Sequence, residues 1–228
     1  MDLLTIFFPK KCINCKKFGD YLCPNCFVLL DFDVALICGI CGKHAVSGLT
    51  HPKCMGRNSI DGIFASLVYK GLTKKLVYQF KFAPYLHTLS SLLVDLLYEG
   101  LIQQESFIKN STKDSLFVPI PLHPGRQRER GYNQALILSQ GLSKKLRIET
   151  RELLSKTKAT SSQVGKTGVE RRQNIKGIFI LVDEIPQDTT IFLVDDVVTS
   201  GATLNEAAGV LKRAGAKAVY GIALAHGL

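Results

Sequence analysis

The sequence contains no apolar run that approaches the ~20 residues needed to cross a membrane. Its first apolar stretch, Leu3–Phe8, is too short for the core of a signal peptide and is followed by a proline and two lysines. With 46% hydrophobic and 21% charged residues, the composition excludes disorder and a coiled coil and is typical of a globular protein. We therefore expect a soluble, cytoplasmic protein without a membrane span.

Acidic residues are scarce as well. The 19 Asp and Glu residues stand against 29 Lys and Arg, which gives a formal net charge of +10 and predicts attraction to polyanions. This excess is uneven, because twelve Lys and Arg but only four Asp and Glu lie between Arg126 and Arg172.

No cysteine follows residue 54, so the seven cysteines between residues 12 and 54 serve one local structure. In a reducing cytoplasm such a cluster is expected to bind metal and not to form disulfides. We therefore divide the chain into a zinc-binding module over residues 1–60 and a larger domain over residues 61–228. The zinc is predicted to be structural, because a segment of this length cannot build a sufficient core alone.

The cysteine spacing predicts the metal ligands. Two Cys-x-x-Cys turns in close succession present four thiolates to one zinc ion, and these are Cys12, Cys15, Cys23 and Cys26. A third such turn and a His-x-x-Cys pair supply a second set, namely Cys38, Cys41, His51 and Cys54. Two alternatives stay open: His51 is a surface residue and this half binds no metal, or the four pairs interleave between the two sites.

The stretch from residue 191 to residue 203 organises the larger domain. Ile191–Val194 is a run of bulky apolar residues, typical of a parallel strand buried on both faces. Asp195 and Asp196 follow at its carboxyl end, where two adjacent carboxylates repel each other unless a cation or sugar hydroxyls share them. A small polar loop then opens an amphipathic helix, whose free N–H groups and dipole favour a phosphate. The alternative is an ordinary helix cap behind two solvated turn residues.

Three arginines at alternate positions precede a Gly-Tyr-Asn-Gln turn and concentrate hydrogen-bond donors in a small space. The alternative is a solvated charge run. Together with the turn and two later arginines, they form the predicted contacts to nucleic acid or pyrophosphate: Arg126, Arg128, Arg130, Tyr132, Asn133, Gln134, Arg171 and Arg172.

Apolar runs predict an α/β fold in which five strands form a parallel sheet with flanking helices. The strands are expected at residues 63–69, 115–122, 179–182, 191–194 and 217–225. Helices are expected after Gly71, after Pro84, behind Gln134 and after Thr203. Residues 103–114 are polar and are interpreted as a surface connection, and residues 156–168 as a mobile loop.

The whole thirteen-residue string from Ile191 to Thr203 resembles the phosphoribosyl-pyrophosphate motif of type I phosphoribosyltransferases, with Ser200 where that family more often has threonine. This resemblance implies that the paired acids hold ribose hydroxyls, with Mg²⁺ nearby, and that the loop holds the 5′-phosphate. The implied contacts to a phosphoribosyl compound are Asp195, Asp196, Val197, Val198, Thr199, Ser200, Gly201, Ala202 and Thr203.

The order of the pieces resembles the ComF family of competence-associated proteins. Val-Pro-Ile-Pro-Leu-His at 118–123, Arg-Gly-Tyr-Asn-Gln at 130–134, Gln163 and Arg-Arg-Gln-Asn at 171–174 precede the acidic motif, behind paired cysteine turns. His51 departs from the family, which more often has cysteine there. The resemblance implies a zinc-ribbon module, a phosphoribosyltransferase-like domain, and a part in DNA uptake and natural transformation through binding of incoming single-stranded DNA. The zinc module is also compatible with docking onto a DNA-translocating helicase.

Whether the chain is an enzyme stays open. The alternative function is an active phosphoribosyltransferase that uses phosphoribosyl pyrophosphate and Mg²⁺ with an unidentified acceptor. No residue set identifies an acceptor base or amine, and Met1 and Asp2 offer no N-terminal cysteine nucleophile for a glutaminase. We therefore favour nucleic-acid binding with a retained phosphoribosyl site.

Overall fold

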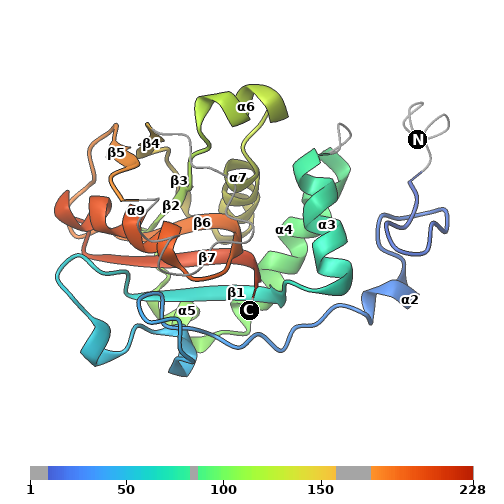
Figure 1. Cartoon of the computed structure of the whole chain (residues 1–228), viewed down its shortest axis with the longest axis horizontal. Helices are drawn as coiled ribbons and strands as arrows, with labels where there is room; N and C mark the ends of the chain where they lie inside the picture. The colour runs from blue at the N-terminus through green and yellow to red at the C-terminus, as the bar shows by residue number, and fades with distance from the viewer. Residues whose placement is uncertain (1–9, 83–86, 158–175, 228) are drawn as a thin grey trace.

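The structure is a computed structural model that describes residues 10–82, 87–157 and 176–227. Its centre is a five-stranded sheet in the order β1-β7-β6-β2-β3, in which every neighbouring pair is parallel (Figure 1). The strands are β1 (Gly62–Val68), β2 (Leu116–Pro119), β3 (Glu149–Thr150), β6 (Thr190–Val198) and β7 (Ala218–His226). The predicted α/β class and five-stranded parallel sheet are therefore confirmed.

Helices cover both faces of this sheet (Figure 1). One face carries α3 (Gly71–Phe82), α4 (His87–Ile102), α5 (Glu105–Asn110) and α7 (Gln134–Leu146), and the other carries α9 (Ala202–Arg213). Alternate residues of β6 divide the core, because Phe192 and Val194 pack toward the first group of helices and Ile191 and Leu193 toward α9. Both faces of β6 are thus buried, as its apolar run predicts.

One predicted strand belongs to a different sheet. Residues 179–182 were expected in the parallel sheet, but β5 (Phe179–Leu181) pairs antiparallel with β4 (Leu154–Lys156) in a separate two-stranded sheet. The place in the main sheet is taken by β3, a two-residue edge strand. The physical reason is burial: Phe179 is buried but Ile180 is 48% exposed, so this segment cannot lie inside a sheet that is covered on both faces.

Residues 103–114 lie mostly at the surface, as predicted, but they are more than an irregular connection. This segment contains helix α5, and its Phe107 is completely buried. The Phe107 ring packs edge-on against Phe64 and Phe192, with centroid distances of 5.9 and 5.3 Å. A single aromatic residue among polar ones gives no hydrophobic periodicity, and the sequence pattern therefore does not predict this helix.

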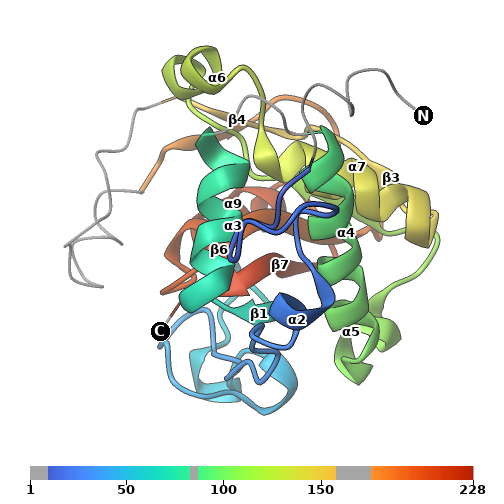
Figure 2. The same cartoon turned by 90° about the vertical axis from the view of Figure 1, so that its right-hand side faces the viewer.

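The described part of the cysteine-rich segment contacts the larger domain at several points along its length. Its first turns, with α2 (Pro24–Phe27), pack beside α3 and α4, and Lys75 Nζ donates a hydrogen bond to Asn14 Oδ1 at 2.9 Å (Figure 2). The chain then passes the edge of β1, where Val68 N–H donates to Asp31 O at 2.8 Å. Its second half contains the 3-10 turns η1 (Val46–Gly48) and η2 (Pro52–Cys54).

The packing of α4 on α7 gives a testable prediction. A Cβ atom at Gly141 would lie 2.3 Å from Val94 Cγ2 and 2.7 Å from Val94 Cγ1. Gly141→Ala should therefore lower the free energy of unfolding by about 1–3 kcal/mol, although alanine favours an isolated helix by about 1 kcal/mol. The measurement is urea denaturation of the purified protein.

The control is the double variant Gly141→Ala with Val94→Ala, because Val94→Ala removes the two clashing methyl groups. The double variant should lose at least about 1 kcal/mol less than the sum of the two single losses. Additive losses would show that the helices move apart without strain.

Candidate functional site

The acidic pair lies inside a strand and not behind it. The sequence suggested that the strand ends at Val194, but β6 continues to Val198. Its neighbours differ in length: β2 pairs only as far as Pro119 opposite Val194, whereas β7 pairs as far as His226 opposite Val198. Beyond Val194 the strand therefore keeps β7 on one side and has no β2 partner on the other. This is the edge where open parallel sheets place their ligands.

A protein lysine, and not only a ligand, relieves the repulsion between the two carboxylates. Lys81 Nζ of α3 lies 2.9 Å from Asp196 Oδ1, and both side chains are largely buried. The Asp195 carboxylate accepts a hydrogen bond from the Asp196 N–H at 2.8 Å and interacts electrostatically with Lys156 of β4. The chain therefore supplies the cation that two adjacent carboxylates were expected to need.

Asp195 binds a proton more tightly than an ordinary aspartate does. Burial, followed by the charge of Asp196, raises the pKa of Asp195 to about 7, although Lys81 and the Asp196 N–H oppose this rise. Asp195 therefore carries a proton in a large fraction of molecules at neutral pH. A bound cation or sugar hydroxyl would favour its ionised form.

The loop at residues 199–203 turns the chain from β6 into α9. Gly201 adopts φ +70° and is the N-cap of α9, so the first N–H groups of this helix have no acceptor within the helix. A hollow of about 40 Å³ lies at this point, which is roughly three times the space that one water needs. It is lined by Leu204 and eight of the nine predicted residues: Asp195, Val197, Val198, Thr199, Ser200, Gly201, Ala202 and Thr203. The ninth, Asp196, faces Lys81.

The end of β7 supports the loop, which sequence reasoning did not predict. His226 is buried, and its Nε2 lies 3.3 Å from the Thr199 carbonyl oxygen. Because a carbonyl only accepts, Nε2 carries the proton in this contact. Burial lowers the pKa of His226, so the ring stays neutral. Gly227 N–H also donates to Val198 O at 2.8 Å. A lone histidine at the end of an apolar strand gives no signal of this role.

The three arginines of the basic segment do not form one cluster. They lie on a short helix, α6 (Pro124–Arg130), which ends at Gly131 with φ +79°. Because residues two apart on a helix face different sides, Arg128 points away from the face shared by Arg126 and Arg130. Arg126 and Arg128 are exposed. Arg130 lies 5.1 Å over the Phe82 ring and donates from Nη1 to Gln134 Oε1 at 3.2 Å. The predicted residues Arg171 and Arg172 lie outside the described residues.

Two of the three predicted contact residues in the turn after α6 are buried and have structural roles. Asn133 is buried and caps α7 by accepting from Ala135 N–H at 3.0 Å, while its Nδ2 donates to Ile120 O at 3.1 Å. Gln134 is also buried. Burial keeps both amides away from the surface that a polymer could contact. Tyr132 is half-buried, and its hydroxyl donates to the Phe80 carbonyl oxygen.

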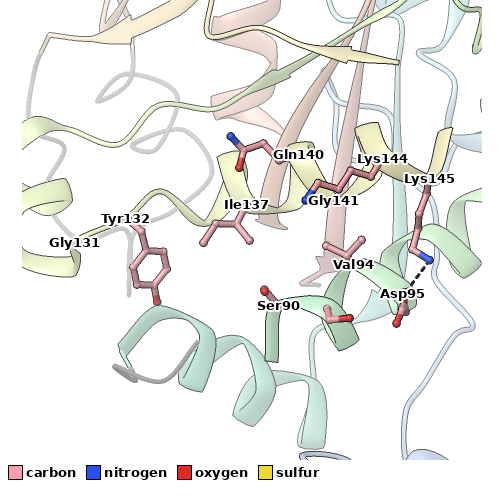
Figure 3. Close-up of a pocket in the computed structure, with 11 residues that line it drawn as sticks. Ser90, Val94, Asp95, Gly131, Tyr132, Ile137, Gln140, Gly141, Lys144 and Lys145 are labelled. Carbon is pink, nitrogen blue, oxygen red and sulfur yellow. Dashed lines mark ion pairs between the residues drawn. The ribbon is translucent and has the colours of Figure 1, made fainter. Parts of the chain in front are cut away.

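A larger hollow of about 730 Å³ lies between α4 and α7 (Figure 3). Tyr132 lies at one end of it, and Lys145 at the other end forms an ion pair with Asp95 at 2.8 Å. Lys144 also lines it and is exposed. Tyr132 connects this groove with the acids, because its hydroxyl donates to the carbonyl oxygen of Phe80, and the next residue, Lys81, contacts Asp196. The groove therefore begins beside the crevice at the end of β6.

The predicted grouping of the metal ligands is confirmed. The ligand atoms of Cys12, Cys15, Cys23 and Cys26 lie within 4.8 Å of one another, as do those of Cys38, Cys41, His51 and Cys54. In the second cluster His51 Nδ1 lies 3.4 Å from Cys41 Sγ, and His51 Nε2 lies 2.9 Å from His44 O. Since that carbonyl only accepts, Nε2 carries the proton and Nδ1 is free to bind a metal. Both clusters could hold a metal such as zinc, as four-ligand structural sites.

Backbone N–H groups prepare one thiol in each cluster for ligation. Burial alone raises the pKa of Cys12, but hydrogen bonds from the backbone of Cys23, Cys15 and Asn14 outweigh it and lower the pKa to about 6. Burial also raises the pKa of Cys38, but hydrogen bonds from the backbone of its neighbours outweigh this effect and lower the pKa to about 6. A thiolate is the form that binds metal.

The parallel sheet, with an acidic pair on a central strand and a loop that opens a helix, is the arrangement of the phosphoribosyltransferase class. The profile of the family described as "Phosphoribosyl transferase domain" matches residues 133–227. Competence protein F of Haemophilus influenzae is 32% identical over 233 residues, which cover 96% of this chain and 99% of the relative. The chain therefore belongs to the ComF family.

Two further relatives agree with this assignment. Competence protein ComFC of Streptococcus pneumoniae is 26% identical over 212 residues, which cover 91% of this chain and 84% of the relative. DNA utilization protein YhgH of Escherichia coli K12 is 40% identical over 104 residues, 45% of each chain. Among the described helices, none combines the length and the apolar character needed to cross a membrane.

The pair of Lys81 and Asp196 gives the prediction of this section. Lys81→Met leaves a buried carboxylate without its cation and should lower the free energy of unfolding at pH 7 by about 2–4 kcal/mol, measured by urea denaturation. Adding Asp196→Asn removes the unpaired charge and should recover at least half of that loss. Lys109→Met is the control, because Lys109 and Glu105 form an exposed pair. If the double variant is as unstable as Lys81→Met, the lysine contributes packing and not charge.

Proposed function

We propose that this protein takes part in natural transformation by binding single-stranded DNA on its basic surface and a phosphoribosyl compound in the crevice at the end of β6. The observation that carries the proposal is the joint position of Asp195 and the 199–203 loop around one hollow. The names of the relatives, competence proteins and DNA utilization proteins, support a role in natural transformation.

The crevice is suited to the two chemical parts of such a ligand. The N–H groups at the start of α9 and the hydroxyls of Thr199 and Ser200 are donors for a 5′-phosphate. Asp195 and Asp196 are acceptors for ribose hydroxyls. Mg²⁺, bound with the ligand, would supply positive charge beside the acids, where Lys81 supplies it in the free protein. When the ligand binds, Mg²⁺ would replace Lys81 as the cation beside Asp196 or would share Asp196 with it.

A second function, transfer of the phosphoribosyl group, is favoured by the cations near Asp195. Lys156 is half-buried and interacts electrostatically with Asp195 and Arg126. Two cations at this position are donors for a leaving pyrophosphate. Incubation with phosphoribosyl pyrophosphate, Mg²⁺ and a panel of acceptors distinguishes the functions, because only a transferase releases pyrophosphate in an acceptor-dependent manner.

The ligand prediction concerns Asp195. Phosphoribosyl pyrophosphate with Mg²⁺ should bind the wild-type protein, and Asp195→Asn should weaken binding by at least about tenfold, because a neutral amide binds a cation more weakly than a carboxylate and accepts fewer hydrogen bonds from hydroxyls. Isothermal titration calorimetry is the measurement. The variant should stay folded and lose no stability at pH 8, since it removes a carboxylate whose pKa is raised. The absence of wild-type binding at millimolar ligand would refute a functional phosphoribosyl site.

The basic surface includes side chains from two elements near the crevice. Arg126 and Arg128 project from α6, and Lys144 lines the groove between α4 and α7. Exposed cations along one path contact the phosphates of a single strand, and an aromatic side chain such as Tyr132 offers a surface for a base. These residues support binding with little sequence preference, because phosphate contacts carry no base information.

The DNA prediction uses salt dependence. Binding of a single-stranded oligonucleotide, followed by fluorescence anisotropy, should weaken linearly in log affinity against log salt, by about 0.7 per phosphate contact. Arg128→Gln with Lys144→Gln should reduce this slope by about 1.4, equally for different sequences. Lys109→Gln on α5 is a control that removes one positive charge far from the proposed path, because α5 and α6 lie on opposite sides of the molecule (Figure 1). Equal slopes for the wild type and the double variant would place the DNA elsewhere.

A further inference from the structure

The second cysteine cluster touches the 199–203 loop through backbone atoms. A Cβ atom at Gly201 would lie 3.0 Å from Gly39 Cα and 3.2 Å from Gly39 O. Gly39 stands between two of the candidate metal ligands, Cys38 and Cys41. The two glycines therefore bring a cysteine turn and the site loop into direct contact, although 162 positions separate Gly39 from Gly201 in the sequence (201 minus 39).

Neither partner in this contact has room to move. Gly201 has φ +70°, a conformation that other residues adopt only with strain. A Cβ at Gly39 would lie 2.8 Å from both Ile60 Cγ2 and Ile63 Cδ1, two core residues that are almost completely buried. Cys38 is buried as well, and its N–H donates to Lys43 O at 2.9 Å. Because close-packed interiors transmit displacements, a shift of the cysteine turn must shift the loop.

The first cysteine cluster has no such contact among the described residues. Cys12, Cys23 and Cys26 pack in the core that includes α3 and α4, beside Asn14 and Lys75. The molecule thus contains two clusters of similar chemistry, of which one touches the site loop. This difference provides an internal control.

We propose that the second cysteine cluster is a positioning element for the site loop, so that metal binding at Cys38, Cys41, His51 and Cys54 and ligand binding at the 199–203 loop are energetically coupled. This inference rests on the proposed phosphoribosyl site. Coupling is reciprocal: metal in the second cluster strengthens ligand binding, and ligand strengthens retention of that metal by the same factor. Gly39 is the positioning residue, because its contact with Gly201 links the cysteine turn to the loop.

The first experiment measures metal release. The full chain, loaded with zinc, is mixed with an excess of a colorimetric zinc chelator, with or without phosphoribosyl pyrophosphate and Mg²⁺. Two zinc equivalents should leave in separable phases, and the ligand should slow one of them by about fivefold or more while the other is unchanged. The Asp195→Asn variant is the control for zinc binding by the ligand itself, since it retains both clusters. Equal rates with and without ligand, or equal slowing of both phases, would overturn the coupling.

The second experiment compares two alanine substitutions within the cysteine-rich segment. Gly39→Ala places its Cβ 2.8 Å from Ile60 Cγ2 and Ile63 Cδ1 and therefore displaces the cysteine turn that contacts the loop, whereas Gly56→Ala places its Cβ where no atom lies within 4 Å. Gly39→Ala should keep both zinc equivalents and weaken binding of phosphoribosyl pyrophosphate by about tenfold in calorimetry. Gly56→Ala should bind as the wild type does.

The outcomes separate this inference from the function on which it rests. If the wild type binds the ligand and Gly39→Ala binds equally well with zinc retained, the positioning role is refuted and the phosphoribosyl site stands. If the wild type does not bind the ligand, both fail. If Gly39→Ala loses zinc from the second cluster, reloading with excess zinc must restore zinc but not affinity; restored affinity would overturn the role of the contact.

Discussion

The parallel pairing of β6 with β7 is the constraint on which the site depends. This ladder continues to Val198 opposite His226, whereas β2 ends its pairing opposite Val194. The four residues of overhang hold the backbone of Asp195 and Asp196 in an extended form while leaving one flank of the strand open. The same ladder carries His226 beneath the loop. One set of backbone hydrogen bonds therefore fixes both the acids and the loop.

Charge inside the crevice is balanced before any ligand arrives. A basic protein would be expected to leave an acidic pair as the attractive point for cations, yet Lys81 already contacts Asp196 and Lys156 interacts with Asp195. Binding of the proposed ligand would therefore be an exchange of partners, and its free energy would be a difference between two sets of ion contacts. A site of this kind favours ligands that bring both anionic groups and hydroxyls, because each displaced contact must be replaced.

Sequence patterns predicted the features that depend on local chemistry. The cysteine spacing gave both ligand sets, and the apolar run and loop of residues 191–203 gave the central strand and the site loop. They missed Lys81 and His226, because these residues reach the site from elements distant in sequence and resemble any helix lysine or core histidine. The segment at 179–182 was assigned to the wrong sheet, because a short apolar run does not indicate which strand it pairs with. Strand pairing and ion pairing between distant elements are decided by tertiary packing, which no local pattern encodes.

His51 lowers the negative charge of the second cluster, and the position of this cluster explains why that matters. With zinc bound, three thiolates and one imidazole carry one fewer negative charge than four thiolates would. The turn at Cys38 and Cys41 contacts the loop proposed to hold a phosphate, and a like charge near an anion weakens its binding. Replacing a thiolate with His51 therefore reduces repulsion at the one cluster that touches the loop. The first cluster packs against α3 and α4 and has four cysteines. Its additional negative charge does not lie beside the loop proposed to hold a phosphate.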